Sequence, residues 1–180
     1  MAEALFSLIV RSRGRPEIRV SSAGTWAAKG SCATPDVLDV LQAVGVDAGE
    51  HRSRPLRRKY IQAADLIVAM TSVHSAEIQD KVSGSGRKIV LLKEVPEIEM
   101  PDLPADVPAQ ERLRHFLRAR RPTWRRALDL DDPMGLPRNA YIRAIKEVWD
   151  GVEALADALI PRAEGPAGVP EREDEAEASA

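Results

Sequence analysis

Two short, unbroken apolar segments constrain the fold more than any other feature of the sequence. Residues 66–70 read Leu-Ile-Val-Ala-Met, and residues 89–92 read Ile-Val-Leu-Leu. Apolar runs of this length without alternation are typical of strands covered on both faces, as in parallel sheets. A helical pattern that Ser72 would cap lies between them and extends to about Val82, followed by a Ser-Gly-Ser-Gly turn at residues 83–86. Strand, helix and strand in this order predict an α/β fold with a parallel sheet.

The start of the chain has the pattern of an amphipathic helix at residues 2–10, with apolar side chains on one face. This helix begins without an N-cap residue and without a strand before it, whereas a helix in an α/β unit normally follows a strand. A short strand is expected at residues 18–21. Together with the two apolar segments this gives three strands, which is few for the number of helices that need covering.

Start and stop signals mark another helix after Thr34. This threonine is followed by Pro35, which gives an N-cap and a proline at the first helical position, and Gly45 supplies the stop. Three prolines prevent regular structure between residues 95 and 107. Further helices are expected at residues 56–63, 109–121 and 139–159.

The length of the chain indicates one domain and a tail, because single domains usually run to about 100–200 residues. We expect a domain at residues 1–160, with an insertion at about residues 95–128. Residues 161–180 contain glycine, prolines, alanines and a Glu/Asp run but no aliphatic stripe, so we expect a disordered acidic tail there.

The formal net charge of -2 argues against an overall electrostatic grip on nucleic acid. The insertion is nevertheless rich in arginine, at Arg112, Arg114, Arg118, Arg120, Arg121, Arg125 and Arg126, near Trp124. These side chains could contact phosphates, but a solvated face on an inserted helix is the usual alternative. Because a grip on phosphates needs a net basic surface rather than one patch, no nucleic-acid partner is expected.

A single cysteine, Cys32, excludes an internal disulfide and fits a reducing cytoplasm. No apolar run approaches the roughly 18–20 residues that a membrane span needs. The first residues have no basic region and no cleavage site, so no signal peptide and no membrane partner are expected. His74 and His115 show no ligand spacing with each other or with Cys32, so neither a metal site nor a cofactor is expected.

An acidic loop precedes the last expected helix. Residues 129–135 read Asp-Leu-Asp-Asp-Pro-Met-Gly, so carboxylates are packed against a proline and a glycine that fix the backbone. A positioned acid on a rigid loop suggests proton donation to a leaving group. A solvated turn is the alternative on these residues alone.

Several stretches, in order, resemble the low-molecular-weight protein-tyrosine phosphatase family, which also includes bacterial protein-arginine phosphatases. Residues 1–6 (MAEALF) resemble the helix directly after the family's phosphate loop, and residues 21–26 (SSAGTW) its second strand and turn. Further matches in family order lie at residues 33–35, 45–47, 51–54, 64–71 with His74, 91–93, and 132–135 (DPMG) with Tyr141. The resemblance covers about residues 1–94 and 129–158. It implies a three-layer α/β sandwich around a short parallel sheet.

The resemblance also implies roles for particular residues. Asp132 matches the family's general acid through the proline that follows it, and Asp131 is the less favoured register. Ser22 and His51 match positions that hydrogen-bond around the phosphate loop, although a strand-end serine and a surface histidine remain the alternatives. Trp26 and Met134 would line the substrate entrance, and a partly buried scaffold tryptophan is the alternative for Trp26.

The family's nucleophile lies in a C-x-x-x-x-x-R loop followed by Ser-Pro, immediately upstream of the Met-Ala-Glu helix. The sequence starts at that methionine, so the nucleophilic cysteine, the phosphate-clamping arginine and the first strand are absent from it. Cys32 does not replace the nucleophile, because Leu38 occupies the position of the arginine. A small buried hydrophobe is the expected role of Cys32.

The resemblance implies that the complete protein is a protein phosphatase, which forms a phosphocysteine and acts on phosphotyrosine or phosphoarginine. The 180-residue chain alone should be inactive. Arsenate reduction, which relatives carry out, would need additional cysteines. A non-catalytic relic or binding module of the same fold is the alternative. A third hypothesis is an interaction protein that uses the basic residues 112–126. The sequence does not specify the oligomeric state.

Overall fold

The structure, a computed structural model, describes residues 1–121 and 128–162. Its sheet consists, within these residues, of two parallel strands, β1 (Ile67–Ala69) and β2 (Ile89–Leu91). Ile67 lies opposite Ile89, and Ala69 lies opposite Leu91. The two apolar segments therefore form neighbouring parallel strands, as the sequence predicts.

The side chains of the two strands alternate between two hydrophobic clusters. Val68 and Val90 pack in the larger cluster. The other strand residues pack in the smaller one: Ile67, Ala69, Ile89 and Leu91. Successive strand residues point to opposite faces of a sheet, so a strand without alternation must be covered on both sides.

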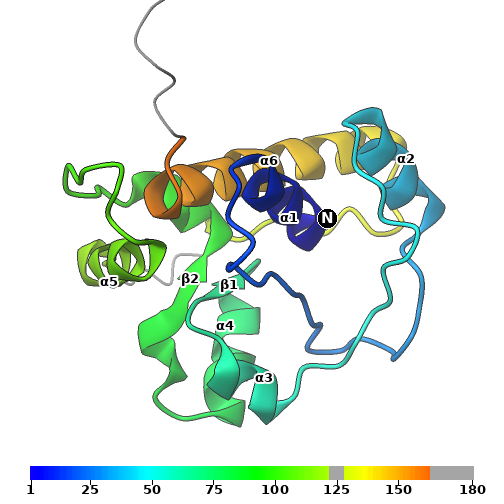
Figure 1. Cartoon of the computed structure of the whole chain (residues 1–180). Coiled ribbons are helices and arrows are strands. Elements are labelled where there is room, and N and C mark those ends of the chain that lie inside the picture. The colour runs from blue at the N-terminus through cyan, green and yellow to red at the C-terminus, as the bar shows by residue number, and fades with distance from the viewer. Residues whose placement is uncertain (122–127, 163–180) are drawn as a thin grey trace, which may run out of the picture.

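Helices supply this cover on both faces of the sheet. Figure 1 shows α1 (Ala2–Ser12) and α6 (Arg138–Leu159) on one side, and α3 (Arg58–Ala63) and α4 (Ser72–Lys81) on the other. The remaining helical elements are α2 (Pro35–Ala43), η1 (Ser85–Lys88), η2 (Leu92–Glu97) and α5 (Ala109–Ala119). The result is an α/β fold in three layers.

The helix boundaries follow local sequence signals. Thr34 is the N-cap of α2, although its side chain makes no capping hydrogen bond, and Pro35 is the first helical residue. Gly45 follows the helix with a φ of 77°, and the amide of Val46 donates to the carbonyl of Leu41 at 2.9 Å. This arrangement closes the helix and explains the glycine, because a side chain at positive φ is strained. Helix α1 has no side-chain cap, as expected.

The strand expected at residues 18–21 is not formed. Ile18 and Val20 pack against the larger cluster, but no ladder of hydrogen bonds joins this segment to another strand of the described residues. The nearest pairing is an isolated parallel bridge between Gly24 and Pro55. The expectation was wrong because apolar side chains predict burial, whereas a strand also needs a neighbouring backbone.

Two further boundaries differ from the sequence prediction. Leu92 begins η2 rather than ending β2, and η2 introduces a short helical segment into the proline-rich region. Helix α6 passes close to it at Gly151, where a Cβ atom would lie 2.6 Å from Cγ of Leu92. The glycine within α6 therefore permits close contact between the two elements.

Helix α5 belongs to the core, and two arginines that were expected to be solvated are buried: Arg112 within the helix and Arg120 directly after it. Phe116 is fully buried in the larger cluster. Arg112 is buried, and its guanidinium donates to the carbonyls of Leu103 and Pro104 at 2.9 and 2.6 Å. Arg120 is buried too and donates to the carbonyl of Gly86 at 3.0 Å. These two arginines close loops rather than face water, whereas Trp124, Arg125 and Arg126 lie outside the described residues.

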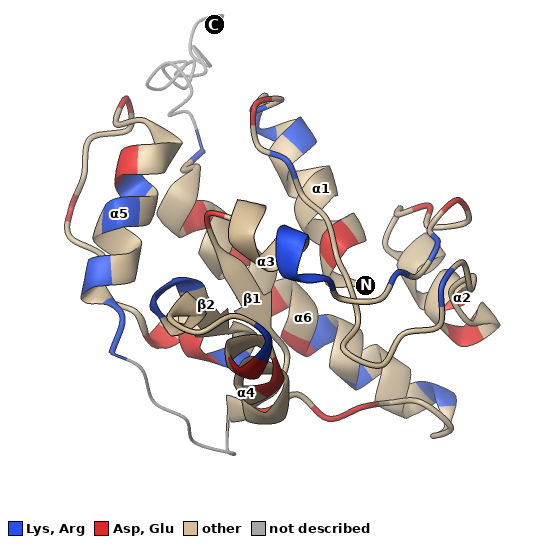
Figure 2. Ribbon diagram, turned by 90° about the horizontal axis from the view of Figure 1, so that it is seen from below, with Lys and Arg blue, Asp and Glu red and all other residues tan. Residues whose placement is uncertain are grey.

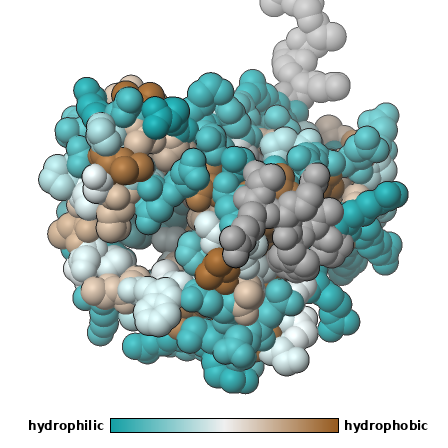
Figure 3. Space-filling model, turned by 180° about the vertical axis from the view of Figure 1, so that it is seen from behind, coloured by the Kyte–Doolittle hydropathy of each residue, from teal (hydrophilic) through white to brown (hydrophobic). Residues whose placement is uncertain are grey.

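The surface is largely hydrophilic on the face shown in Figure 3, where hydrophobic residues form small, separate groups. Among the described residues, no helix has the length and apolar character required to cross a membrane. The expected acidic tail lies outside the described residues beyond Arg162.

Candidate active site

The acidic loop is anchored where β1 ends and α4 begins. One carboxylate oxygen of Asp129 accepts a hydrogen bond from the amide of Ser72 at 2.5 Å, and the other accepts one from the Ser72 hydroxyl at 3.0 Å. The amide of Leu130 donates to the carbonyl of Met70 at 2.9 Å, and Leu128 is buried in the smaller cluster. A carboxylate at a helix N-terminus is favourable, because it accepts unpaired amides and faces the positive end of the helix dipole.

The cap of α4 therefore differs from the one that the sequence predicts. Thr71, not Ser72, is the N-cap, and its hydroxyl accepts a hydrogen bond from the amide of His74 at 3.2 Å. Ser72 is the first helical residue and is held by Asp129 instead. A single sequence does not reveal this pairing, because the two residues are 57 positions apart.

Asp132 lies at the exposed turn of the same loop. Its Oδ1 atom accepts a hydrogen bond from the amide of Met134 at 3.0 Å. The turn closes through the amide of Leu136, which donates to the carbonyl of Pro133 at 3.0 Å, and Gly135 has a φ of 76°. The loop thus holds the carboxylate of Asp132 in a defined place, which the spacing of proline and glycine predicts.

A cleft of about 240 Å³ separates the acidic loop from α6. It is lined by Asp131, Asp132, Pro133, Leu136, Ala140, Arg143, Ala144 and Glu147. Three carboxylates and one guanidinium contribute to this lining beside four apolar residues, so the charged groups around Asp132 are mainly acidic. The cleft is smaller than the roughly 300–1,000 Å³ of sites that enclose a drug-sized ligand.

Ser22 and His51 are brought together by Glu3. Its Oε2 atom accepts hydrogen bonds from the amide and hydroxyl of Ser22, at 3.1 and 2.5 Å, and lies 3.6 Å from Nδ1 of His51. The side chain of Arg54 donates to the carbonyl of Ser22 at 2.6 Å. Glu3 is the central member of this cluster. Sequence reasoning did not single it out, although an acidic residue in the first turn of an uncapped helix was a usable signal.

Trp26 projects from its loop and is not a buried scaffold residue. Its side chain is 88% exposed, and its indole N–H donates to Glu77 on α4 at 2.7 Å. Hydrogen bonds from the side chains of Thr25 and then Trp26 lower the pKa of Glu77. The indole is therefore held in place although it is almost entirely in solvent.

The predicted site residues form two groups. Ser22 and His51 meet at Glu3, while Asp132 and Met134 share the acidic loop. Within the part of the chain that the structure describes, no hydrogen bond or ion pair joins these groups directly. Helix α4 contacts the loops of both groups, since its first residue binds Asp129 of the acidic loop and its Glu77 binds Trp26.

Cys32 is exposed, so the expectation that it fills a buried apolar position was wrong. It lies in the loop before α2, where the backbone groups of Gly30 and Ser31 pair with Ser53 and leave the thiol outside the core. Among the described residues, no three histidine, cysteine, aspartate or glutamate side chains gather closely enough to hold a metal ion.

Comparison with known proteins identifies relatives over the first part of the chain. The profile described as low molecular weight phosphotyrosine protein phosphatase matches residues 1–108. The probable low molecular weight protein-tyrosine-phosphatase EpsP of Ralstonia nicotianae is 30% identical over 102 residues, which cover 57% of this chain and 67% of EpsP. The protein-arginine-phosphatase of Bacillus subtilis is 36% identical over 94 residues, which cover 52% of this chain and 61% of that protein. The matched region thus spans about two thirds of the length of these relatives.

Solved structures show the same fold over most of the chain. A low molecular weight protein tyrosine phosphatase from T. tengcongensis superposes with a TM-score of 0.66 at 23% identity, covering 88% of each chain. The YwlE arginine phosphatase from Geobacillus stearothermophilus superposes with a TM-score of 0.64 at 28% identity, covering 88% of this chain and 82% of that one.

Proposed function

Because this chain belongs to the low molecular weight phosphotyrosine protein phosphatase family, we propose that the complete protein removes phosphate from phosphotyrosine or phosphoarginine in other proteins. A cysteine thiolate attacks phosphorus, and the bond from phosphorus to the tyrosine oxygen or arginine nitrogen breaks. Water then hydrolyses the phosphocysteine and releases inorganic phosphate. The names of the two relatives support both substrates, one being a tyrosine and the other an arginine phosphatase.

We assign the general acid to Asp132. It would donate its proton to the leaving oxygen or nitrogen and then accept a proton from the attacking water. The anchoring of its loop carries this proposal: Asp129 and Leu130 fix the loop to the carboxyl end of β1. In parallel α/β sheets, ligands bind beside the carboxyl ends of the strands. A solvated turn without function would not require such an anchor.

The remaining predicted residues receive supporting roles in this proposal. Ser22 and His51 hold the phosphate loop in shape through hydrogen bonds, with Glu3 fixing their positions. Trp26 and Met134, both exposed, line the substrate entrance. Residues 1–160 act as one folding unit, because Phe116 of the insertion is buried in the same cluster as residues of α1 and α6. The single, free cysteine is consistent with a cytoplasmic location.

The 180 residues of this chain contain no C-x-x-x-x-x-R pattern, since Cys32 is the single cysteine and is followed six positions later by Leu38. We therefore propose that this chain alone is inactive, and that residues encoded upstream of Met1 supply the nucleophile and the phosphate-binding arginine. The same observation favours a second candidate, a non-catalytic binding module of this fold.

The DNA upstream of Met1 and the N-terminal peptide of the native protein distinguish the two candidates. An in-frame Cys-x-x-x-x-x-Arg-Ser-Pro segment directly before Met1, present in the mature protein by mass spectrometry, supports the phosphatase. A native N-terminus at Met1 supports the binding module. Hydrolysis of p-nitrophenyl phosphate and phosphoarginine by the extended protein then tests the activity itself.

A further inference from the structure

The segment that leads from α2 into the first turn of α3 concentrates positive charge in a chain whose net charge is -2. Residues 52–59, called the basic segment below, contain five cationic side chains: Arg52, Arg54, Arg57, Arg58 and Lys59. No acidic residue occurs between Glu50 and Asp65. Figure 2 shows the start of α3 in unbroken blue, whereas α4 carries acidic residues. The charge of the basic segment is therefore not balanced within its own stretch of sequence.

Other parts of the described structure do not balance this charge either. Arg57, Arg58 and Lys59 are exposed, and no carboxylate of the described residues pairs with them. By contrast, Arg13 and Arg15 near the end of α1 pair with carboxylates at 2.6 Å. The cations of the basic segment are thus available to an outside partner.

The two inner arginines make contacts with backbone and aromatic groups. Arg52 donates to the carbonyls of Gly49 and His51, both at 2.8 Å. Arg54 donates to the carbonyl of Ser22, and its guanidinium lies 4.7 Å from the ring centre of Tyr60. These contacts position both guanidinium groups and leave their charge unneutralised.

The basic segment is rigidly joined to the loop that carries Trp26. The amide of Gly24 donates to the carbonyl of Arg54 at 3.0 Å, and the amide of Leu56 donates to the carbonyl of Gly24 at 2.8 Å. Two more backbone bonds join Ser53 to Gly30 and Ser31. Because Glu77 also fixes its indole, Trp26 offers a large aromatic surface that loses little freedom on binding.

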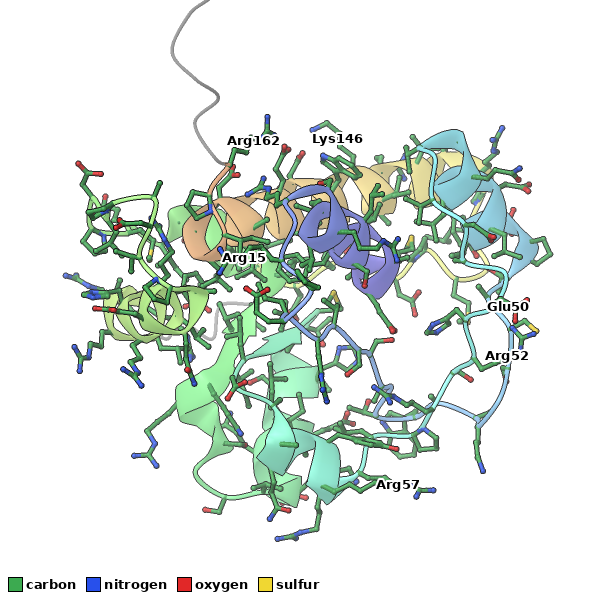
Figure 4. The ribbon with its side chains drawn as sticks, viewed as in Figure 1. Arg15, Glu50, Arg52, Arg57, Lys146 and Arg162 are labelled. Carbon is green, nitrogen blue, oxygen red and sulfur yellow. The ribbon has the colours of Figure 1, made fainter. Side chains whose placement is uncertain are left out.

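The basic segment contacts the Ser22–His51 cluster of the candidate active site. Arg54 contacts Ser22, which binds Glu3 together with His51. In Figure 4, Arg57 points away from the ribbon at the start of α3, and Arg52 lies earlier in the same segment. The basic segment thus runs from the Ser22–His51 cluster toward open solvent.

We infer that the basic segment and Trp26 form a docking surface for an acidic stretch of the phosphorylated protein substrate, adjacent to the phosphorylated residue. This inference rests on the proposed function, because it takes the Ser22–His51 cluster as part of the phosphatase site. Carboxylates of the substrate pair with Arg57, Arg58 and Lys59, and an apolar or aromatic side chain packs on the indole.

Charge distribution favours a short acidic peptide over a nucleic acid or an anionic membrane. A long polyanion extends beyond this patch and meets acidic residues elsewhere on a chain whose net charge is -2, including Asp131 and Asp132 of the acidic loop. A peptide of a few residues meets only the basic segment. The basic segment therefore favours substrates that have acidic residues next to the phosphorylated residue.

Binding of a short fluorescein-labelled peptide rich in Glu, measured by anisotropy at low salt with the full 180-residue chain, tests this inference. We expect R57E/R58E to weaken binding by about tenfold or more, and W26A to weaken it severalfold. R57K/R58K retains the charge and should bind like the wild type. The matched control R114E/R118E reverses two exposed arginines on α5 and should leave binding unchanged.

Equal weakening in R57E/R58E and R114E/R118E would overturn the inference, because binding would then depend on total charge alone. Tighter binding of single-stranded DNA or phosphatidylserine vesicles than of the peptide would overturn it as well. If circular dichroism shows that R57E/R58E is unfolded, the neutral variant R57Q/R58Q is measured in its place. Peptide binding requires no turnover, so the two proposals can fail separately. A complete protein that binds the peptide but is inactive refutes the proposed function alone. A complete protein that is active but does not bind the peptide refutes this inference alone.

Discussion

The contact between Asp129 and Ser72 should be the main anchor of the acidic loop, and its removal has a calculable cost. Both carboxylate oxygens accept hydrogen bonds from Ser72, at 2.5 and 3.0 Å. Loss of a capping side chain costs about 0.5–2 kcal/mol, and loss of a negative charge at a helix N-terminus costs about 0.3–1 kcal/mol. We therefore expect Asp129→Ala to lower the free energy of unfolding by about 2 kcal/mol. Asp129→Asn should cost about half as much, because its carbonyl oxygen still accepts one hydrogen bond.

Urea denaturation followed by circular dichroism measures these differences. Asp131→Ala is the matched control, because Asp131 is an exposed carboxylate of the same loop that makes no hydrogen bond to α4 in the described structure. Its effect should stay within about 0.5 kcal/mol. If Asp129→Ala is no more destabilising than Asp131→Ala, the anchoring of the loop is refuted, and with it the argument that assigns a defined position to Asp132.

Two further predictions concern packing and pH. Gly151→Ala should destabilise the protein by about 1–2 kcal/mol, because the new Cβ would lie 2.6 Å from Cγ of Leu92. This overpacking outweighs the roughly 1 kcal/mol gain in helix propensity, and thermal unfolding at a higher temperature than the wild type would contradict the prediction. Hydrogen bonds from Thr25 and then Trp26 lower the pKa of Glu77 in the folded state below its ordinary value of 4.5. Between the lowered pKa and pH 4.5, the unfolded state therefore binds more protons at Glu77 than the folded state does. Stability from this contact is present above pH 4.5 and is lost as the pH falls through the lowered pKa, and Glu77→Gln should make unfolding less dependent on pH in that window.

The two buried strands were predictable because they are defined by local composition. Residues 66–70 and 89–92 have no polar interruption, and a strand covered on both faces permits none. The start and stop of α2 were likewise predictable, since proline and glycine act through their own backbone geometry. The segment at residues 18–21 was not, because its state depends on a partner strand rather than on its own residues.

The candidate site was predictable only where its residues are close in sequence. The turn around Asp132 follows from Pro133 and Gly135. The pairs Asp129–Ser72 and Trp26–Glu77 each join distant segments, and a single sequence carries no signal for them. Composition misled the prediction for Cys32, which is small and apolar but lies exposed in a loop held by hydrogen bonds to the backbone and the hydroxyl of Ser53.

The insertion shows why counts of charged residues do not predict exposure. Seven arginines between residues 112 and 126 suggested a solvated face. Two of them are buried: Arg112 donates to the carbonyls of Leu103 and Pro104, and Arg120 donates to the carbonyl of Gly86 and lies 3.5 Å from a carboxylate oxygen of Glu94. A guanidinium has five donors, so it can serve several such acceptors at once. Lysine, with a compact charge, would bind these loops less well.

The role of Asp132 is the central claim, and a protein that carries the proposed Cys-x-x-x-x-x-Arg segment before Met1 tests it most directly. Hydrolysis of aryl phosphates by Asp132→Asn should be slower by about 10²–10⁴, and the loss should shrink for substrates with very acidic leaving groups, which need little protonation. Asp131→Asn should retain wild-type rates, and the chain that begins at Met1 should show no turnover. An equal loss in Asp131→Asn would contradict the assignment, as would turnover by the chain from Met1 that Cys32→Ser abolishes.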